Sequence, residues 1–158
     1  MTSVHDEQGT SVTAERDEDR IRAVLRERAA AVDAQDADRL VACYAPGVVL
    51  FDLEPPLVHR AEEVLDPDRT RAWFATWEDD MAYAVHDLTV VVGGDVAFAH
   101  GLVRLSGTSQ GATEPAALWF RTTLCLQKAA GTWSISHEHD STPFYMDGSL
   151  RAAVDLQP

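Results

Sequence analysis

Asp52 is the carboxylate best placed for chemistry in this sequence, because it lies within the apolar run of residues 48–53. If this run forms a strand, its alternation puts Asp52 on the same face as Val48 and Leu50. Burial among apolar neighbours would raise the pKa of its carboxyl, which suits a base that abstracts protons near neutral pH. An aspartate that caps the turn at Pro55-Pro56 is the alternative interpretation.

His137 and His139 lie two positions apart in a predicted strand, and therefore on one of its faces. The same alternation puts Trp133 and Ile135 on the inward face with the histidines, and Glu138 and Asp140 on the outward face. Three interpretations of the pair are open. The histidines could lie in the core or at the pocket rim with their hydrogen bonds satisfied by the protein, they could form hydrogen bonds or exchange protons with a ligand in the pocket, or they could bind a metal ion. Metal sites of the cupin type need a third ligand and an all-β barrel, whereas helices open this chain, so we expect no metal.

Further candidates lie on other predicted elements. Arg121, flanked by Trp119 and Thr123, could hold an anionic or carbonyl oxygen, or form a structural ion pair with an acidic residue. His100, between apolar neighbours, is either a hydrogen-bonded core histidine or a catalytic group. Tyr44 could direct its hydroxyl into a pocket or pack at a helix end.

The chemistry open to these residues is proton transfer without a cofactor. The sequence has no nucleophile elbow, P-loop, dinucleotide fingerprint or HExxH motif, which argues against serine hydrolysis and nucleotide chemistry. Isomerisation, aldol-type cyclisation, dehydration or epoxide opening needs one base, one or two hydrogen-bond donors and a dry cavity. The candidate catalytic residues are Asp52, His100 and His139, and the candidate substrate-binding residues are Tyr44, Trp119, Arg121 and His137.

The elements that must position these residues begin with helices. Periodicity predicts a helix over residues 15–35, then a short one that starts after Asp36, carries Tyr44 and stops at Pro46-Gly47. Asp66-Pro67 predicts the start of a third helix. One face of that helix is expected to carry four large apolar residues: Trp73, Phe74, Trp77 and Met81.

Two hairpins are predicted in the second half of the chain, separated by a flexible loop over residues 107–115. Residues 83–92 and 96–106 flank Gly93-Gly94, and residues 117–128 and 132–140 flank a turn at 129–131. Helices followed by an antiparallel meander predict an α+β fold with the helices on one face of a curved sheet.

The composition indicates an acidic globular chain. Of 158 residues, 13 are Lys or Arg and 26 are Asp or Glu, so the net charge is −13. Such a chain lacks the clustered cations that bind nucleic acids or anionic membranes, and its length favours one domain. It shows no signal peptide or membrane span, and Cys43 and Cys125 have no CxxC spacing, so we expect a cytoplasmic protein with reduced thiols.

Several short motifs carry a resemblance to a known family: Tyr44-Ala45-Pro46-Gly47, Phe51-Asp52 with Pro55-Pro56-Leu57, Gly94-Asp95-Val96-Ala97, Trp119–Thr123, and Trp133–Ser141 followed by Pro143-Phe144. With this order of elements, residues 15–145 resemble the nuclear-transport-factor-2-like superfamily, in particular its SnoaL-like and ketosteroid-isomerase-like members. The resemblance implies a cone in which the sheet wraps the helices, a pocket open at one end, and a dimer.

The resemblance also implies a role for Asp52, which falls where ketosteroid isomerases hold their general base. The two oxyanion donors of those enzymes fall near Arg28 and Thr123, so the chain departs from the family pattern there.

These observations predict an α+β fold in which a cone-shaped, curved antiparallel sheet wraps N-terminal helices around one internal pocket. Residues 1–13 are expected to form a disordered acidic tail, 14–145 the domain and 146–158 a C-terminal tail. The predicted function is a cofactor-independent isomerase, cyclase or lyase for a small hydrophobic, polyketide- or steroid-like molecule, in secondary metabolism. The alternative is a non-catalytic ligand-binding or assembly module. A homodimer through the sheet is expected, with no nucleic-acid or membrane partner, no cofactor and no metal.

Overall fold

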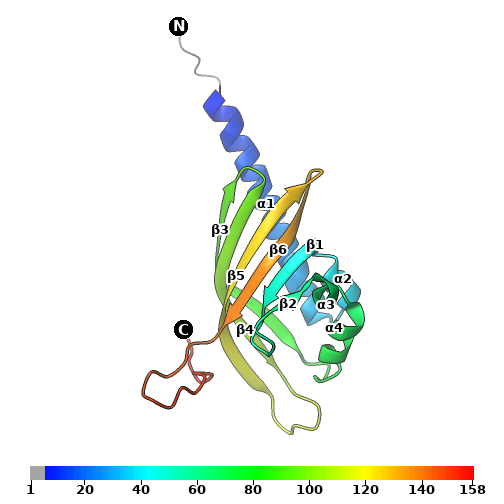
Figure 1. Ribbon diagram of the computed structural model, residues 1–158, viewed down its shortest axis with the longest axis vertical. Helices are drawn as coiled ribbons and strands as arrows, with labels where there is room; N and C mark the ends of the chain where they lie inside the picture. The colour runs from blue at the N-terminus through cyan, green and yellow to red at the C-terminus, as the bar shows by residue number, and fades with distance from the viewer. Residues whose placement is uncertain (1–5) are drawn as a thin grey trace.

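The computed structural model describes the backbone of residues 6–158 and the side chains of residues 12–158. Its architecture is α+β, as predicted, with a curved sheet wrapped against helices (Figure 1). The long helix α1 (Asp6–Asp33) runs along the sheet, and three short helices gather beside one end of it: α2 (Ala37–Val41), α3 (Ala61–Val64) and α4 (Pro67–Phe74). The chain therefore buries one face of a single sheet.

Six strands form the sheet, in the order β2-β1-β6-β5-β4-β3. They are β1 (Tyr44–Phe51), β2 (His59–Arg60), β3 (Ala82–Gly93), β4 (Val96–Gly107), β5 (Ala116–Ala129) and β6 (Thr132–Ser141). The two predicted hairpins are the β3–β4 and β5–β6 pairs. The sheet is not wholly antiparallel as predicted, because β1 pairs with β6 in parallel. This parallel pair brings the first strand next to the last.

α1 begins at Asp6, well before the predicted start at residue 15. The prediction depended on apolar periodicity, which the polar residues before 15 lack. Residues 1–5, which belong to the expected N-terminal tail, lie outside the described residues.

Tyr44 begins strand β1, so its predicted place in the second helix is wrong. α2 ends at Val41, and two residues later the carbonyl of Cys43 accepts a bond of 2.9 Å from the amide of Ile135 in β6. Pairing with β6 therefore draws the chain into the sheet before Pro46-Gly47. Those two residues fall where the β1–β6 register shifts, so the missing amide of the proline is tolerated there.

A bulge in β6 reverses the predicted alternation of its side chains. Leu126 of β5 pairs with Ile135, but the neighbouring Cys125 pairs with His137, so Ser136 is an extra residue. The Ser136 hydroxyl donates to the carbonyl of Cys125 over 3.2 Å. Beyond the bulge the two acids are buried and the histidines are not: Glu138 is 1% exposed and Asp140 8%. The prediction that His137 and His139 face inward is therefore wrong.

α4 starts as predicted but is shorter. Asp66 caps it by accepting a bond from the amide of Asp68 over 2.9 Å, and the helix ends at Phe74. Trp77 instead forms a bridge with Ser109 in the loop after β4, and Met81 lies just before β3. The four apolar residues therefore belong to two segments, because the carboxylate of Asp80 and the loop at Thr108 bind each other over 2.7–2.8 Å and hold the chain in a turn.

Three clusters of apolar side chains fill the space between the sheet and the helices. Ile21 and Leu25 of α1 pack on Leu124, Leu126 and other inward residues of the central strands. None of the helices described between residues 6 and 158 is long and apolar enough to cross a membrane.

The segment after β6 folds back on itself. Phe144 forms a bridge with Ala152, and the amide of Ala153 donates to the carbonyl of Pro143 over 2.8 Å. Ala153 is buried, so part of the segment expected as a tail, 146–158, packs against the residues before it.

Candidate functional site

A cavity of about 380 Å³ lies between the inner face of the sheet and the helices. Its size falls in the range of roughly 300–1,000 Å³ that is typical of small-molecule sites. Apolar side chains from helices and strands form much of the wall, among them Val32, Leu40, Leu50, Val64, Trp73, Leu105 and Phe120. Ten residues with polar side chains also line the cavity: Arg28, Tyr44, Asp52, Glu54, Arg69, Thr70, Thr76, Tyr83, Glu138 and Asp140. The site is thus an apolar hollow with a concentrated polar patch.

Glu138 and Arg28 form a buried ion pair at this patch. Arg28 of α1 donates through Nε to Oε2 of Glu138 over 3.1 Å and through Nη2 to Oε1, a bidentate pairing. The side chains are 9% and 1% exposed. Burial disfavours the charge of Arg28, but the Glu138 carboxylate, together with Tyr44, Tyr83 and Asp140, more than offsets this and raises the pKa of Arg28 well above its usual value. The guanidinium thus faces the carboxylate through two of its nitrogens, away from solvent.

Two tyrosines complete the surroundings of this pair. The Tyr44 hydroxyl donates to Oε2 of Glu138 over 2.7 Å and accepts from Nε of Arg28 over 3.1 Å. The guanidinium carbon of Arg28 lies 5.0 Å from the centre of the Tyr83 ring, a cation–π contact. Burial raises the pKa of both phenols, so each keeps its proton.

Asp140 is the second buried acid of β6 and has no such partner. Its Oδ1 atom and the hydroxyl of Thr122, its cross-strand neighbour, are both buried and unbonded among the described residues. Burial, and then the negative charge of Glu138, raise the pKa of Asp140 well above its usual range. Asp140 therefore keeps its proton to a higher pH than an exposed aspartate does, and in that protonated form the carboxyl can donate a hydrogen bond.

Asp52 lines the same cavity from the end of β1. Val48 and Leu50 share its inward face, as the alternation predicts. Its Oδ1 accepts the amide of Leu53 over 2.7 Å, which is a local turn contact. Burial raises the pKa of Asp52, and the Leu53 amide partly opposes that shift. The residue therefore combines a turn-capping contact with a place in the cavity wall.

The other five predicted site residues do not line the cavity: His100, Trp119, Arg121, His137 and His139. His100, Trp119 and Arg121 alternate with inward residues of β4 and β5, such as Ala99 and Phe120, and so project from the outer face. There Trp119 packs on His86 with ring centres 4.9 Å apart.

The two histidines of β6 are displaced from the cavity by the bulge. His137 contacts the carbonyl of Val49 through Nδ1 over 2.8 Å, and the Phe51 ring lies edge-on to both histidines at 4.8 and 5.6 Å. Of the seven predicted site residues, the structure thus brings Asp52 and Tyr44 together in one cavity.

Sequence reasoning missed Arg28, Glu138 and Asp140 as site residues. Arg28 carried a signal, because it continues the apolar stripe of the first helix between Leu25 and Val32. A cation on such a stripe needs a buried partner. The two acids carried no comparable signal, since their inward direction depends on the bulge.

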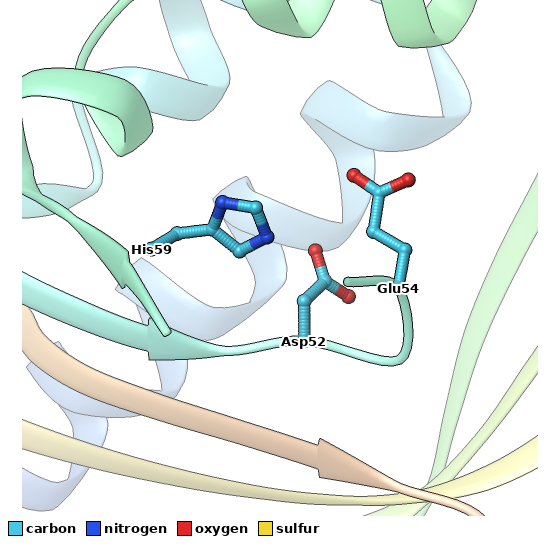
Figure 2. A group of neighbouring side chains, drawn as sticks. All are labelled: Asp52, Glu54 and His59. Atoms are coloured by element: carbon cyan, nitrogen blue, oxygen red, sulfur yellow. The ribbon is translucent and has the colours of Figure 1, made fainter. Parts of the chain in front are cut away.

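A second polar cluster lies beside Asp52, toward the loop that follows β1. The side chains of Asp52, Glu54 and His59 converge, with His59 reaching across from β2 (Figure 2). One ligand atom from each lies within 4.8 Å of the other two. This donor set of one nitrogen and two oxygens has the composition of a transition-metal site.

Comparisons with known proteins agree with this fold. A family model described as the SnoaL-like domain matches residues 21–145. An NTF2-like protein of unknown function from Pseudomonas putida KT2440 is 26% identical with a TM-score of 0.77, over 94% of this chain and 98% of that one. No curated protein matches.

Two further solved structures share the fold at lower identity. A ketosteroid isomerase-like protein from Erwinia carotovora atroseptica is 21% identical with a TM-score of 0.65, over 77% of this chain and 92% of that one. A provisionally named scytalone dehydratase from Novosphingobium aromaticivorans is 12% identical with a TM-score of 0.74, over 90% and 94%.

Proposed function

This chain belongs to the SnoaL-like domain family, and from that premise we propose that it is a cofactor-independent acid–base catalyst. It acts as an isomerase, cyclase or lyase on a small hydrophobic molecule with a carbonyl group, of polyketide or steroid type. One observation carries the proposal: a single cavity holds Asp52, which forms no ion pair among the described residues, together with Asp140, a buried carboxyl with a raised pKa, and the buried cation Arg28.

Asp52 is the proton acceptor in this proposal. It stands on the inward face of β1 beside Leu50, with one carboxylate oxygen bonded to Leu53 and held in place. A partly desolvated carboxylate with a raised pKa is a stronger base toward a carbon acid than one in water. Fixing one oxygen also orients the other toward the cavity.

Asp140 and Arg28 stabilise the charge that develops. A carboxylic acid that stays neutral can donate a hydrogen bond to an oxyanion, the role a protonated aspartate has in ketosteroid isomerases. Arg28 adds a positive potential whose direction is fixed by Glu138 and Tyr44. Arg28 stands at one of the two positions where the resemblance placed the family's oxyanion donors, with another residue type, and Asp140 lies at neither of them.

The proton and electron balance needs no further reactant. Asp52 removes a proton from the carbon next to the carbonyl, and the electron pair of the C–H bond moves onto the carbonyl oxygen, which accepts a hydrogen bond from Asp140. The enolate collapses when Asp52 returns the proton to another carbon, when the enolate carbon adds to a second carbonyl whose oxygen takes the proton from Asp52, or when a β-hydroxyl takes that proton and leaves as water. These outcomes are isomerisation, cyclisation and dehydration.

A non-catalytic ligand carrier or assembly module is the second candidate. It is favoured by the way in which Arg28, Tyr44 and Glu138 satisfy one another, which leaves few free donors in the cavity. A carrier needs a fitting apolar hollow and no free base. Substitution of the base therefore separates the two functions.

The test is Asp52→Asn, after a thermal-shift screen of aromatic polyketide and steroid-like ketones has found a ligand that is turned over. Asn keeps the shape and removes the basicity, so turnover is expected to fall at least roughly a hundredfold while ligand affinity changes little. The free energy of unfolding of Asp52→Asn should equal or exceed that of the unaltered protein, because a poorly solvated charge is removed. Asp79→Asn, at an exposed position away from the cavity, is the matched control. Unchanged turnover, or failure of Asp52→Asn to fold, would show that Asp52 caps the turn and is not the catalytic base.

A further inference from the structure

Asp52, Glu54 and His59 offer three ligand atoms at the edge of the cavity, all within 4.8 Å of one another (Figure 2). A tetrahedral zinc ion with bonds of about 2.1 Å would hold its ligands about 3.4 Å apart. The ligand atoms must therefore draw together by about an ångström. Glu54 is exposed on the loop after β1, so rotation of its side chain can supply much of this movement.

His59 is held in the form that a metal ion requires. Its ring is 3% exposed, and its Nδ1 lies 2.7 Å from Oε2 of Glu63, four residues further along the chain. Nδ1 faces a carboxylate oxygen, which accepts, and Nε2 faces the Arg69 guanidinium, which only donates, so the contacts fit the tautomer with its proton on Nδ1 and its lone pair on Nε2. A carboxylate behind a histidine in this way orients metal-binding histidines in proteins.

A cation already occupies the space between these groups. Nη2 of Arg69, from α4, donates to Oε1 of Glu54 over 3.0 Å and lies 3.3 Å from Nε2 of His59. Among the described residues, the guanidinium is paired with the carboxylate of Glu54 alone, and its positive charge slightly opposes the rise in the pKa of Asp52. The side chain of Arg69 is 31% exposed, so it can turn out into solvent and free both ligand atoms.

We propose that Asp52, Glu54 and His59 bind a divalent transition-metal ion such as Zn²⁺, which takes the place of the Arg69 guanidinium. The site differs from the His137 and His139 pair, for which no metal is expected and which lies on the other side of the sheet. Glu63 positions His59 and does not contact the ion. Since Asp52 is shared, a bound ion would also remove the base of the proposed reaction; this consequence alone rests on the proposed function.

Calorimetric titration of Zn²⁺ into chelator-treated full-length protein tests the site without any substrate. We expect one ion per chain, with binding weakened at least tenfold in Glu54→Gln and in His59→Gln, and about 10–100-fold in Glu63→Gln. Arg69→Met removes the competing cation and should tighten binding by roughly tenfold or more. Co²⁺ in place of Zn²⁺ would report the coordination geometry by its visible absorption. A melting curve for each variant shows whether it is folded. If His59→Gln does not fold, Glu54→Gln still tests the site, because Glu54 is exposed and its replacement should not affect folding.

The double variant His137→Ala/His139→Ala is the matched control, and its Zn²⁺ affinity should equal that of the unaltered protein. Absence of binding at submillimolar Zn²⁺ in both the unaltered protein and Arg69→Met overturns the proposal. Unchanged affinity in Glu54→Gln, or loss of binding in the double variant, also overturns it, because the ion would then be held elsewhere. Inhibition of turnover by Zn²⁺ is a separate readout, so failure of the proposed reaction would leave the binding result intact.

Discussion

Glu138 and Asp140 stand two positions apart on one strand, yet their surroundings differ. Glu138 accepts three hydrogen bonds from Arg28 and Tyr44. Asp140 has no ion-pair partner among the described residues, and burial together with the repulsion from Glu138 raises its pKa. One carboxyl therefore positions other groups, and the other can act as an acid that donates a hydrogen bond.

Replacement of Asp140 by Asn gives a prediction at the residue scale. The pKa of Asp140 is raised by folding, so the folded protein retains a proton that the unfolded chain loses above about pH 4. The unaltered protein therefore loses stability as the pH rises from that value toward the raised pKa. Asn does not titrate, so the stability of Asp140→Asn relative to the unaltered protein should rise between pH 4 and pH 7, by about 1.4 kcal/mol for each unit by which folding raises the pKa of Asp140 within that range. Urea denaturation at both pH values measures this. A pH-independent difference, like that expected for Asp79→Asn, would contradict the shifted pKa.

Irregularities in two strands set the geometry of the sheet at the scale of elements. The extra residue Ser136 in β6 turns Glu138 and Asp140 inward. β3 has its own register shift between His86 and Thr89, with Asp87 at a φ of 52°. That irregular stretch comes close to Gly101 of β4, where a Cβ atom would lie 2.8 Å from the carbonyl oxygen of His86. Glycine at 101 therefore allows β3 to bend against β4.

Gly101→Ala is accordingly expected to destabilise the protein. The added methyl meets backbone atoms of β3, which cannot rotate away as a flexible side chain could, so we expect a loss of about 1–3 kcal/mol in the free energy of unfolding. Gly47→Ala is the matched control in another strand, because no atom lies within 4 Å of the Cβ position there. Urea denaturation compares the two. Equal stability of both variants would show that β3 shifts without cost.

The whole molecule presents large apolar side chains on the outer face of its sheet as well as an apolar core. On that face Phe98 is 44% exposed, Val91 44%, and Phe51 39%, and the helices cover the opposite side of the sheet. A sheet face that stays in water is commonly polar, whereas this face carries exposed apolar side chains among its polar ones. We therefore propose that two copies of the chain pair through the outer faces of their sheets, as the sequence predicts. The cytoplasmic location expected from the sequence remains a prediction.

Light scattering at micromolar concentration tests the pairing. The unaltered protein should have twice the chain mass of 17.3 kDa, and Phe98→Asp should return it to the single-chain mass, because a charge in an apolar interface is poorly solvated. Asp79→Asn should remain paired. A mass of 17.3 kDa for the unaltered protein would contradict pairing through this face.

Local signals in the sequence determined most of the framework. Gly93-Gly94 and the turn at Ala130-Gly131 separate the hairpins, Asp36 and Asp66 cap their helices, and the apolar run before Asp52 forms an inward-facing strand. Such features depend on residues a few positions apart, whose turn preferences and periodicity can be evaluated without the rest of the chain. The family resemblance supplied the order of the layers, and the SnoaL-like match over residues 21–145 agrees with it.

Tertiary structure alone decided the polar interior of the cavity. Arg28 meets Glu138 across 110 positions in the sequence, and periodicity holds no information about a partner at that distance. One inserted residue also reverses the alternation of side chains along a strand. The bulge at Ser136 therefore puts Glu138 and Asp140 on the inward face, where His137 and His139 were predicted. Register between strands is set by the best packing of the entire sheet against its helices, a property that no single segment contains.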